Sequence, residues 1–283
     1  MKKNSLITKK SKYENVKSIN KSNSLIRSKT TKKLSLMSYK LVNHLYYDLQ
    51  KSYNFEKDID FSKPLTIKLQ TLREYLGISK KNKNYQQVIK DTLEELKTEI
   101  QLQNYEKDGK SFEWYKTQFI GDIGMFKSKT NKKERVFHIE IKQTLYEVIE
   151  RSNKNFTPFK LEIIDGFRSV KTLRLYEYIK SFSNMSKTGY LYIDNINNIL
   201  TSNYRYLSQT LRLIERNIEI INETTELKIT IDYYHKEKYL VFKITNYKEL
   251  KEQHKKEVEE QKSHHEINAI IDLIGKKGGS YEK

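Results

Sequence analysis

The spacing of apolar residues predicts the same order of secondary-structure elements twice along this chain. Each series has an amphipathic helix, a short strand, a short helix, a longer helix and a β-hairpin. The first series lies within residues 21–155 and the second within residues 169–245, although the halves share little sequence identity. Because such helices and strands must bury their apolar sides together, we expect an α+β protein with two similar domains.

The elements of the first half follow from apolar spacing and turn residues. Residues 34–50 are spaced for a helix. After them we expect a strand over 63–69, helices over 69–78 and 85–100, extended segments over 101–119 and 135–141, and a helix over 144–152. The helix over 85–100 is expected to point Val88, Ile89, Leu93 and Leu96 inward. Asp108-Gly109 is a favourable hairpin turn.

The second half repeats this order after a connecting segment, residues 156–168. We expect a helix over 169–183, a strand over 189–194, helices over 195–201 and 204–222, and a hairpin over 227–244 that turns at His235-Lys236. Residues 1–20 are expected to form a disordered basic arm, and residues 246–283 a charged helical tail, because few of their residues are apolar.

A short helix, a turn and a longer helix followed by a hairpin describe a winged helix, in which the hairpin is the wing. The chain is therefore predicted to contain two tandem winged-helix domains, residues 21–155 and 169–245, related by pseudo-symmetry. In such a domain the second helix of the helix-turn-helix enters the major groove of DNA.

The helix predicted over 204–222 has two different sides. The apolar side, which would dock the helix on its own domain, has Leu207, Leu211, Ile214, Ile218 and Ile221. The side expected to face DNA has Arg205, Ser208, Gln209, Arg212 and Arg216. Arginine can bond guanine and glutamine adenine through two hydrogen bonds, and the N-terminal half of such a helix usually reaches the bases. Arg216, farther along, is better placed for a phosphate, and Ser208 could contact a base or a phosphate. Alternatively, the arginines are solvated or paired with Glu215 and Glu219.

The corresponding helix of the first half, over 85–100, is predicted to be a poorer base reader. Its outward positions include Gln86, Gln87, Lys90, Glu94 and Glu95, and two glutamates would repel phosphates. The lysines just before it, Lys80, Lys81 and Lys83, are expected to hold the DNA backbone, which fixes register without reading sequence. The first domain would thus clamp phosphates and support self-association, while the second reads bases.

Both wings have basic tips. Lys236 and Lys238 lie at the tip of the second hairpin and are expected to contact phosphates beside the groove. The first wing has Lys127, Lys129, Lys132 and Lys133 around a polar loop. The alternative for both is a charged hairpin tip without a partner.

A formal net charge of +18 and a pI of about 9.5 favour a polyanionic partner. A solvated basic surface or a protein that lies on acidic membranes is the alternative.

The chain has no cysteine, which excludes disulfides, thiolate metal sites and cysteine nucleophiles. It has no apolar run long enough to span a bilayer, and its basic N-terminus lacks the apolar stretch of a signal peptide, so we expect a soluble cytoplasmic protein.

No catalytic, metal or cofactor site is predicted. None of the six histidines is separated from another by one residue, as a metal-dependent DNA-nicking site would require. His138-Ile139-Glu140 begins like a deaminase motif, but the required cysteines are absent. The nine glycines form no phosphate-binding loop. We therefore expect a binding protein that is not an enzyme.

Three motifs in order give a resemblance to a known family. KSNSLI (21–26) with LS (34–35), LRLYEYIK (173–180) and LIERNIEIINETTEL (213–227) resemble segments of the iteron-binding plasmid replication initiators, a two-winged-helix family. The similarity covers roughly residues 18–245. The sequence departs from the family pattern at Asn217, where a small alanine is usual, and at Arg27-Ser28-Lys29, which is more basic.

The resemblance implies binding to direct repeats of double-stranded DNA at a plasmid origin. It also implies a dimer that represses its own gene, a monomer that starts replication, and contacts with the host initiator and helicase. A two-domain transcriptional regulator without a replication role is the main alternative, because it would use the same DNA-binding face.

Overall fold

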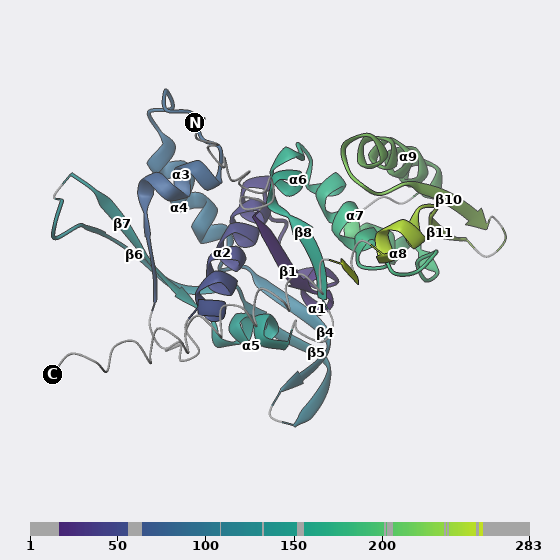
Figure 1. Cartoon of the computed structure of the whole chain (residues 1–283), viewed down its shortest axis with the longest axis horizontal. Coiled ribbons are helices and arrows are strands. Elements are labelled where there is room, and N and C mark those ends of the chain that lie inside the picture. The colour runs from purple at the N-terminus through teal and green to yellow at the C-terminus, as the bar shows by residue number, and fades with distance from the viewer. Residues whose placement is uncertain are drawn as a thin grey trace, which may run out of the picture. The chain divides into compact units, whose positions relative to one another are not determined.

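A computed structural model describes most of the chain, in two compact units (Figure 1). The described residues are 17–55, 64–107, 109–131, 133–151, 156–200, 202, 206–234, 236, 238–252 and 255–256. The first unit is drawn from residues 1–181 and 193–225, and the second from residues 182–192 and 226–283.

The first unit contains all the helices that have a label in Figure 1. They are α1 (Asn23–Ile26), α2 (Leu36–Phe55), α3 (Leu69–Tyr75), α4 (Tyr85–Glu95), α5 (Gln143–Arg151), α6 (Leu161–Gly166), α7 (Val170–Lys180), α8 (Ile193–Leu200) and α9 (Leu207–Thr224). Its strands are β1 (Ser18–Ser22), β2 (Lys29–Thr30), β3 (Leu65–Lys68), β4 (Glu99–Lys107), β5 (Lys110–Gln118), β6 (Ile120–Lys127), β7 (Arg135–Ile141) and β8 (Phe156–Lys160). The second unit has β9 (Leu191–Tyr192), β10 (Ile229–Tyr234) and β11 (Tyr239–Ile244).

The predicted α+β class and the doubled order of elements are confirmed. The first series runs α2-β3-α3-α4-β6-β7, and the second runs α7-β9-α8-α9-β10-β11. In both series the short strand pairs with the last strand of the wing, so that the sheets have the orders β3-β7-β6 and β9-β11-β10. This is the strand order of a winged helix. The pseudo-symmetry in space stays a prediction.

A second hairpin interrupts the first series between its long helix and its wing. Strands β4 and β5 pair from Glu99↔Gln118 to Lys107↔Lys110, and β2 pairs with the other edge of β4. Gly109 in the turn has φ +71°, the left-handed conformation that glycine adopts without strain. The helix predicted over 85–100 is therefore too long, because α4 ends at Glu95 and Glu99 already belongs to β4.

The segment predicted as a connection between the halves is a strand and a helix. Strand β8 pairs with β1 from Ser18↔Lys160 to Ser22↔Phe156, and α6 follows directly. Strand β1 begins inside the predicted arm of residues 1–20, so that this boundary was wrong; residues 1–16 lie outside the described part of the chain. Of the predicted tail, residues 247–252 are helical, and residues 257–283 lie outside the description.

Apolar residues of α2 and α4 form much of the first core. Leu41 and Leu45 of α2 and Ile89 and Leu93 of α4 are almost fully buried, and the two helices pack together. Val88 was predicted to point inward but is half-buried. No described helix combines the length and apolar character needed to cross a membrane.

The LS motif has a structural role at the start of α2. The Ser35 hydroxyl accepts a hydrogen bond from the Ser38 amide at 3.2 Å. Glu95, at the end of α4, accepts hydrogen bonds from the Ser35 amide at 2.9 Å and from the Ser38 hydroxyl at 2.6 Å. Partial burial raises the pKa of Glu95, but these bonds outweigh burial and lower it below its ordinary value. Glu95 thus caps a neighbouring helix instead of pointing outward as predicted.

Candidate nucleic-acid interface

The strongest candidate surface is the outer side of α9. The helix begins at Leu207, after Tyr206 at its N-cap, and ends at Thr224. It starts three residues later than predicted from the sequence. Arg205 lies outside the described residues, so that its place on the DNA-facing side stays a prediction.

The inner side of α9 packs against α7. Ile214, Ile218 and Ile221 are buried, as the apolar stripe predicts. Near the N-terminal end of α9 the buried residue is Thr210, whereas Leu211, predicted to be part of the apolar side, is half-buried. The side chain of Leu207 lies outside the description.

Asn217, the position that departs from the family pattern, joins α9 to α7. Its side chain is buried and accepts a hydrogen bond from the Thr172 hydroxyl at 2.5 Å. Its amide nitrogen donates to the Leu213 carbonyl at 2.7 Å. A buried amide that is bonded on both sides fixes the rotation of α9 on α7.

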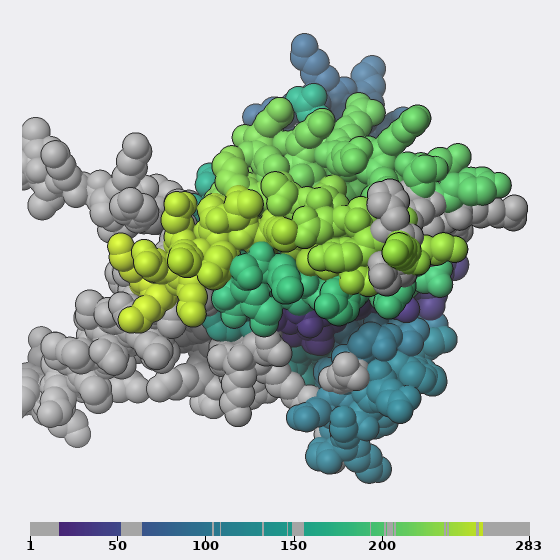
Figure 2. All heavy atoms as spheres, turned by 90° about the vertical axis from the view of Figure 1, so that its right-hand side faces the viewer, coloured from purple at the N-terminus to yellow at the C-terminus, as the bar shows by residue number. Residues whose placement is uncertain are grey.

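The outer side of α9 is accessible, and the green part of the chain that contains α9 lies at the surface in Figure 2. Ser208, Gln209, Arg212 and Arg216 are all exposed. Within the described part of the chain neither arginine forms an ion pair, so that the alternative of pairing with Glu215 or Glu219 is not realised there. Both guanidinium groups are available to a ligand.

Charge is graded along this outer side. The basic and amide side chains, from Gln209 to Arg216, lie in the first three turns together with one exposed carboxylate, Glu215, whereas the exposed charged residues near the end, Glu219 and Glu223, are both acidic. Carboxylates repel phosphates, so that a duplex would approach the N-terminal part of the helix. That is also the part of a recognition helix that usually meets base edges.

The second wing presents its predicted lysines. Lys236 and Lys238 are exposed at the tip of the β10–β11 hairpin, and Lys238 has φ 56°. Lys243, on β11, is paired with Asp232 at 2.6 Å and is less available.

Sequence reasoning missed a row of tyrosines on the same sheet. Tyr190, Tyr192 and Tyr234 are 63%, 51% and 41% exposed. Their ring centroids lie 4.6, 5.9 and 4.6 Å from that of Tyr239. Tyr234 pairs with Tyr239 across β10 and β11, and Tyr239 pairs with Tyr192 across β11 and β9. Finding this row from the sequence would require the register of the sheet, which the sequence alone does not give.

The predicted phosphate-binding lysines of the first half are accessible. Lys80, Lys81 and Lys83 are exposed in the turn between α3 and α4, and none pairs with a carboxylate in the described structure. In the first wing Lys127, Lys129 and Lys133 are also exposed, whereas Lys132 lies outside the description.

The outward glutamines of α4 are already bonded within the protein. Gln87 donates to Asp91 at 2.7 Å, and Gln86 contacts the Met125 sulfur at 3.4 Å. The predicted weakness of α4 as a base reader therefore has a second cause besides its carboxylates.

A buried charge network joins two of the sequence motifs. Lys21 of KSNSLI is 2.7 Å from Glu177 of LRLYEYIK, and both are buried. Burial lowers the pKa of Lys21, and the Glu177 carboxylate opposes that shift. Arg174, also buried, donates to the carbonyl oxygens of Ile26 and Ser28, each at 2.9 Å. These residues hold α7 to the N-terminal segment. Two charged residues among the apolar positions of α7 were the signal that sequence reasoning did not use.

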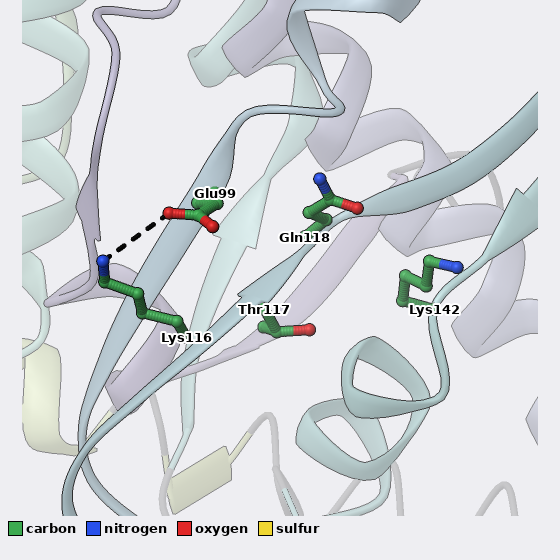
Figure 3. A pocket seen from close by; sticks show the side chains of 5 residues that line it. All are labelled: Glu99, Lys116, Thr117, Gln118 and Lys142. Carbon is green, nitrogen blue, oxygen red and sulfur yellow. Dashed lines mark ion pairs between the residues drawn. The ribbon is translucent and has the colours of Figure 1, made fainter.

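A polar pocket of about 230 Å³ lies beside β4 and β5 (Figure 3). It is lined by Glu99, Lys116, Thr117, Gln118 and Lys142. Lys116 pairs with Glu99 at 3.7 Å, and Lys142 pairs with Glu140 at 2.9 Å. Among the described residues there is no cluster of three or more metal-binding side chains.

Comparison with known proteins gives one family match. A family model described as "Initiator Replication protein, WH1" matches residues 18–180, from the start of β1 to the end of α7. A crystal structure of the Pi initiator protein in complex with iteron DNA is 16% identical, with a TM-score of 0.49, over 81% of this chain and 96% of that one. A structure of domains 2 and 3 of RctB is 13% identical, with a TM-score of 0.46, over 77% and 85%. No curated protein gives a significant match.

Proposed function

Because this chain belongs to the initiator replication protein family, we propose that it binds direct repeats of double-stranded DNA at a plasmid origin and thereby initiates replication. The family match spans more than half of the 283 residues. The observation that carries the proposal is the outer side of α9, where Arg212 and Arg216 are exposed without an ion pair in the described structure.

Recognition would depend on the N-terminal part of α9. Arg212 has the planar fork that bonds guanine O6 and N7, and Gln209, one turn earlier, has the amide that bonds adenine. Arg216, one turn after Arg212, would contact a phosphate, and Ser208 a base or a phosphate. Because Asn217 and the buried isoleucines fix the helix on α7, these side chains would be presented in one orientation.

The remaining basic elements would hold the sugar-phosphate backbone. Lys236 and Lys238 of the second wing and Lys80, Lys81 and Lys83 of the first half are exposed and suited to phosphates. Such contacts set affinity, register and salt dependence, but they do not read sequence.

We propose no chemical step for the protein. Opening of the origin would come from the free energy of binding and bending DNA, together with the host initiator and helicase. Repression of its own gene is a further part of the proposal.

Self-association would use the first half of the chain. Strand β5 is at the edge of its sheet, and Trp114 on it is 55% exposed. An unpaired edge strand with an exposed aromatic side chain is suited to pairing with a second copy.

Selection of bound sites from random duplex DNA tests the proposal. The wild-type protein is expected to enrich one sequence that occurs as tandem direct repeats beside an AT-rich tract near its gene. An inverted repeat over a promoter would instead favour a transcriptional regulator. The variant with Gln209→Ala and Arg212→Ala should lose the preference at specific bases, whereas Arg168→Ala, an exposed arginine outside α9, should retain it. Enrichment of no sequence by the wild type would refute the proposal.

A further inference from the structure

The segment 27–33, here called the basic strap, carries Arg27, Lys29, Lys32 and Lys33 within seven residues. It follows the short helix α1, whose Leu25 and Ile26 are buried, and it ends at the buried Leu34. Apolar anchors on both sides therefore hold the two ends of the strap on the first unit.

Hydrogen bonds also fix the backbone of the strap. The Arg174 guanidinium binds the carbonyl oxygens of Ile26 and Ser28 at its start. Lys29 and Thr30 form strand β2, which pairs with β4. The amide of Thr31 donates to the Glu99 carbonyl at 3.0 Å. The strap is thus an ordered part of the structure.

Arg174 is an unusual residue to use for this purpose. Its side chain is only 6% exposed, and burying a guanidinium is costly unless its donors are bonded. The nearest carboxylate, Glu177, is 3.9 Å away and already binds Lys21 at 2.7 Å. One of the two short bonds of Arg174 goes to Ser28 in the strap and the other to Ile26 directly before it, and a planar fork is suited to reach both carbonyls in this way.

The lysines of the strap are left without acidic partners. Lys29, Lys32 and Lys33 are exposed, and in the described residues no carboxylate pairs with them. Two glutamates that contact the strap or the residue after Leu34 through hydrogen bonds have other side-chain partners: Glu99 pairs with Lys116, and Glu95 binds Ser35 and Ser38. Three positive charges are therefore concentrated on a fixed backbone, which suits a polyanion because little ordering is needed on binding.

We propose that the basic strap is a phosphate-contacting element for duplex DNA, and that Arg174 is its positioning residue. The proposal rests on the proposed function, since the phosphates are those of the bound duplex. The strap adds contacts outside the helix-turn-helix and wing elements, on a segment that is more basic than the family pattern. Lysines hold phosphates as point charges, so that the strap adds affinity and register but no base preference.

The first test replaces the three lysines together, Lys29→Ala, Lys32→Ala and Lys33→Ala. Binding is measured by fluorescence anisotropy at several salt concentrations, with the selected duplex and with a scrambled duplex. The slope of log affinity against log salt should become shallower by roughly three units, about one for each lost phosphate contact. The ratio of affinities for the two duplexes should stay unchanged.

A charge-matched control separates contact from net charge. The control replaces Lys51, Lys110 and Lys248 with alanine, which are exposed lysines on separate elements. It should retain the wild-type salt slope. If the strap variant and the control have the same slope, the strap is not a phosphate contact. If selection yields no preferred duplex, the proposed function fails instead, which is a different outcome.

The second test concerns Arg174. Arg174→Lys retains the charge near Glu177 but removes the fork that binds two carbonyls. Its salt slope should become shallower toward that of the strap variant, and combining it with the three lysine substitutions should add little further change. A variant with a lower unfolding temperature but the wild-type slope would show that Arg174 is only structural. If the variant does not fold, the surface lysine variant still decides whether the strap contacts phosphate.

Discussion

Helices α4 and α9 hold the same place in the two series, but their outer side chains are used differently. Both bury apolar residues at helical spacing, with Leu93 in α4 and Ile214 in α9 fully buried. On α4, Gln87 of the outer side is bonded to Asp91, and Glu95 binds Ser38 at the start of α2 instead of facing outward. On the outer side of α9, Arg212 and Arg216 form no ion pair in the described structure.

This difference shows that reading DNA requires side chains that the fold does not already use. A glutamine that is hydrogen-bonded within the protein must break that bond before it can bind a base, so that the net free energy gained on binding DNA is smaller. An exposed arginine without a partner loses only water and side-chain freedom. The shared order of elements thus sets where a recognition helix lies. The hydrogen bonds and ion pairs of its outer side chains decide which of the two helices can read bases.

The largest expected effect tests whether the inner sides of the two helices are equivalent. Leu93→Ala and Ile214→Ala each remove a fully buried side chain, so that each should lower the free energy of unfolding by about 2–5 kcal/mol. Urea unfolding followed by circular dichroism measures the loss. A loss below about 1 kcal/mol for Ile214→Ala would mean that α9 is not docked as described.

The second prediction tests the outer sides. Arg212→Ala should weaken binding to the selected duplex by about 1–3 kcal/mol and relax preference at one base position. Gln87→Ala on α4 is the matched substitution and should leave base preference unchanged, because Gln87 is bonded to Asp91. Competition binding against duplexes with single base changes measures both. Equal loss of preference in the two variants would contradict the assignment of reading to α9.

The sequence was sufficient for the order of elements because this order depends on local apolar spacing and turn residues. It predicted the inner residues Ile214, Ile218 and Ile221 and the exposure of Arg212 and Arg216, since a helix has a fixed period. It misplaced the start of α9, because Tyr204 and Arg205 extend the pattern without showing where the cap lies.

Contacts between segments far apart in the sequence could not be predicted from local apolar spacing. Lys21 and Glu177 are far apart in the sequence, and only the pairing of β1 with β8 and the packing of α1 on α7 bring them together. Glu95 was expected to face outward, and only the packing of α4 against the start of α2 gives its carboxylate the partners Ser35 and Ser38. The ion pairs and caps that decide which polar side chains remain free depend on tertiary structure.

The third prediction concerns Glu95, the carboxylate at the end of α4 that caps the start of α2. Ser38→Ala removes a hydrogen bond to it and should cost about 1 kcal/mol of stability at neutral pH. Because these bonds lower the pKa of Glu95 in the folded state, their stabilisation is present above its ordinary value of 4.5 and is lost as the pH falls through the folded value. The stability difference between wild type and variant should therefore shrink in acid. A difference that is independent of pH would mean that Glu95 is not the partner.

The smallest expected effect compares the phosphate contacts of the two halves. Lys81→Ala, before α4, and Lys236→Ala, at the second wing, should each weaken binding to all duplexes alike and reduce the salt slope by about one unit. Both lysines are exposed, so that stability should not change. The same salt titration with selected and scrambled duplexes measures this. If Lys81→Ala altered base preference while Lys236→Ala did not, the first half of the chain would also read sequence. The assignment of base reading to α9 alone would then be wrong.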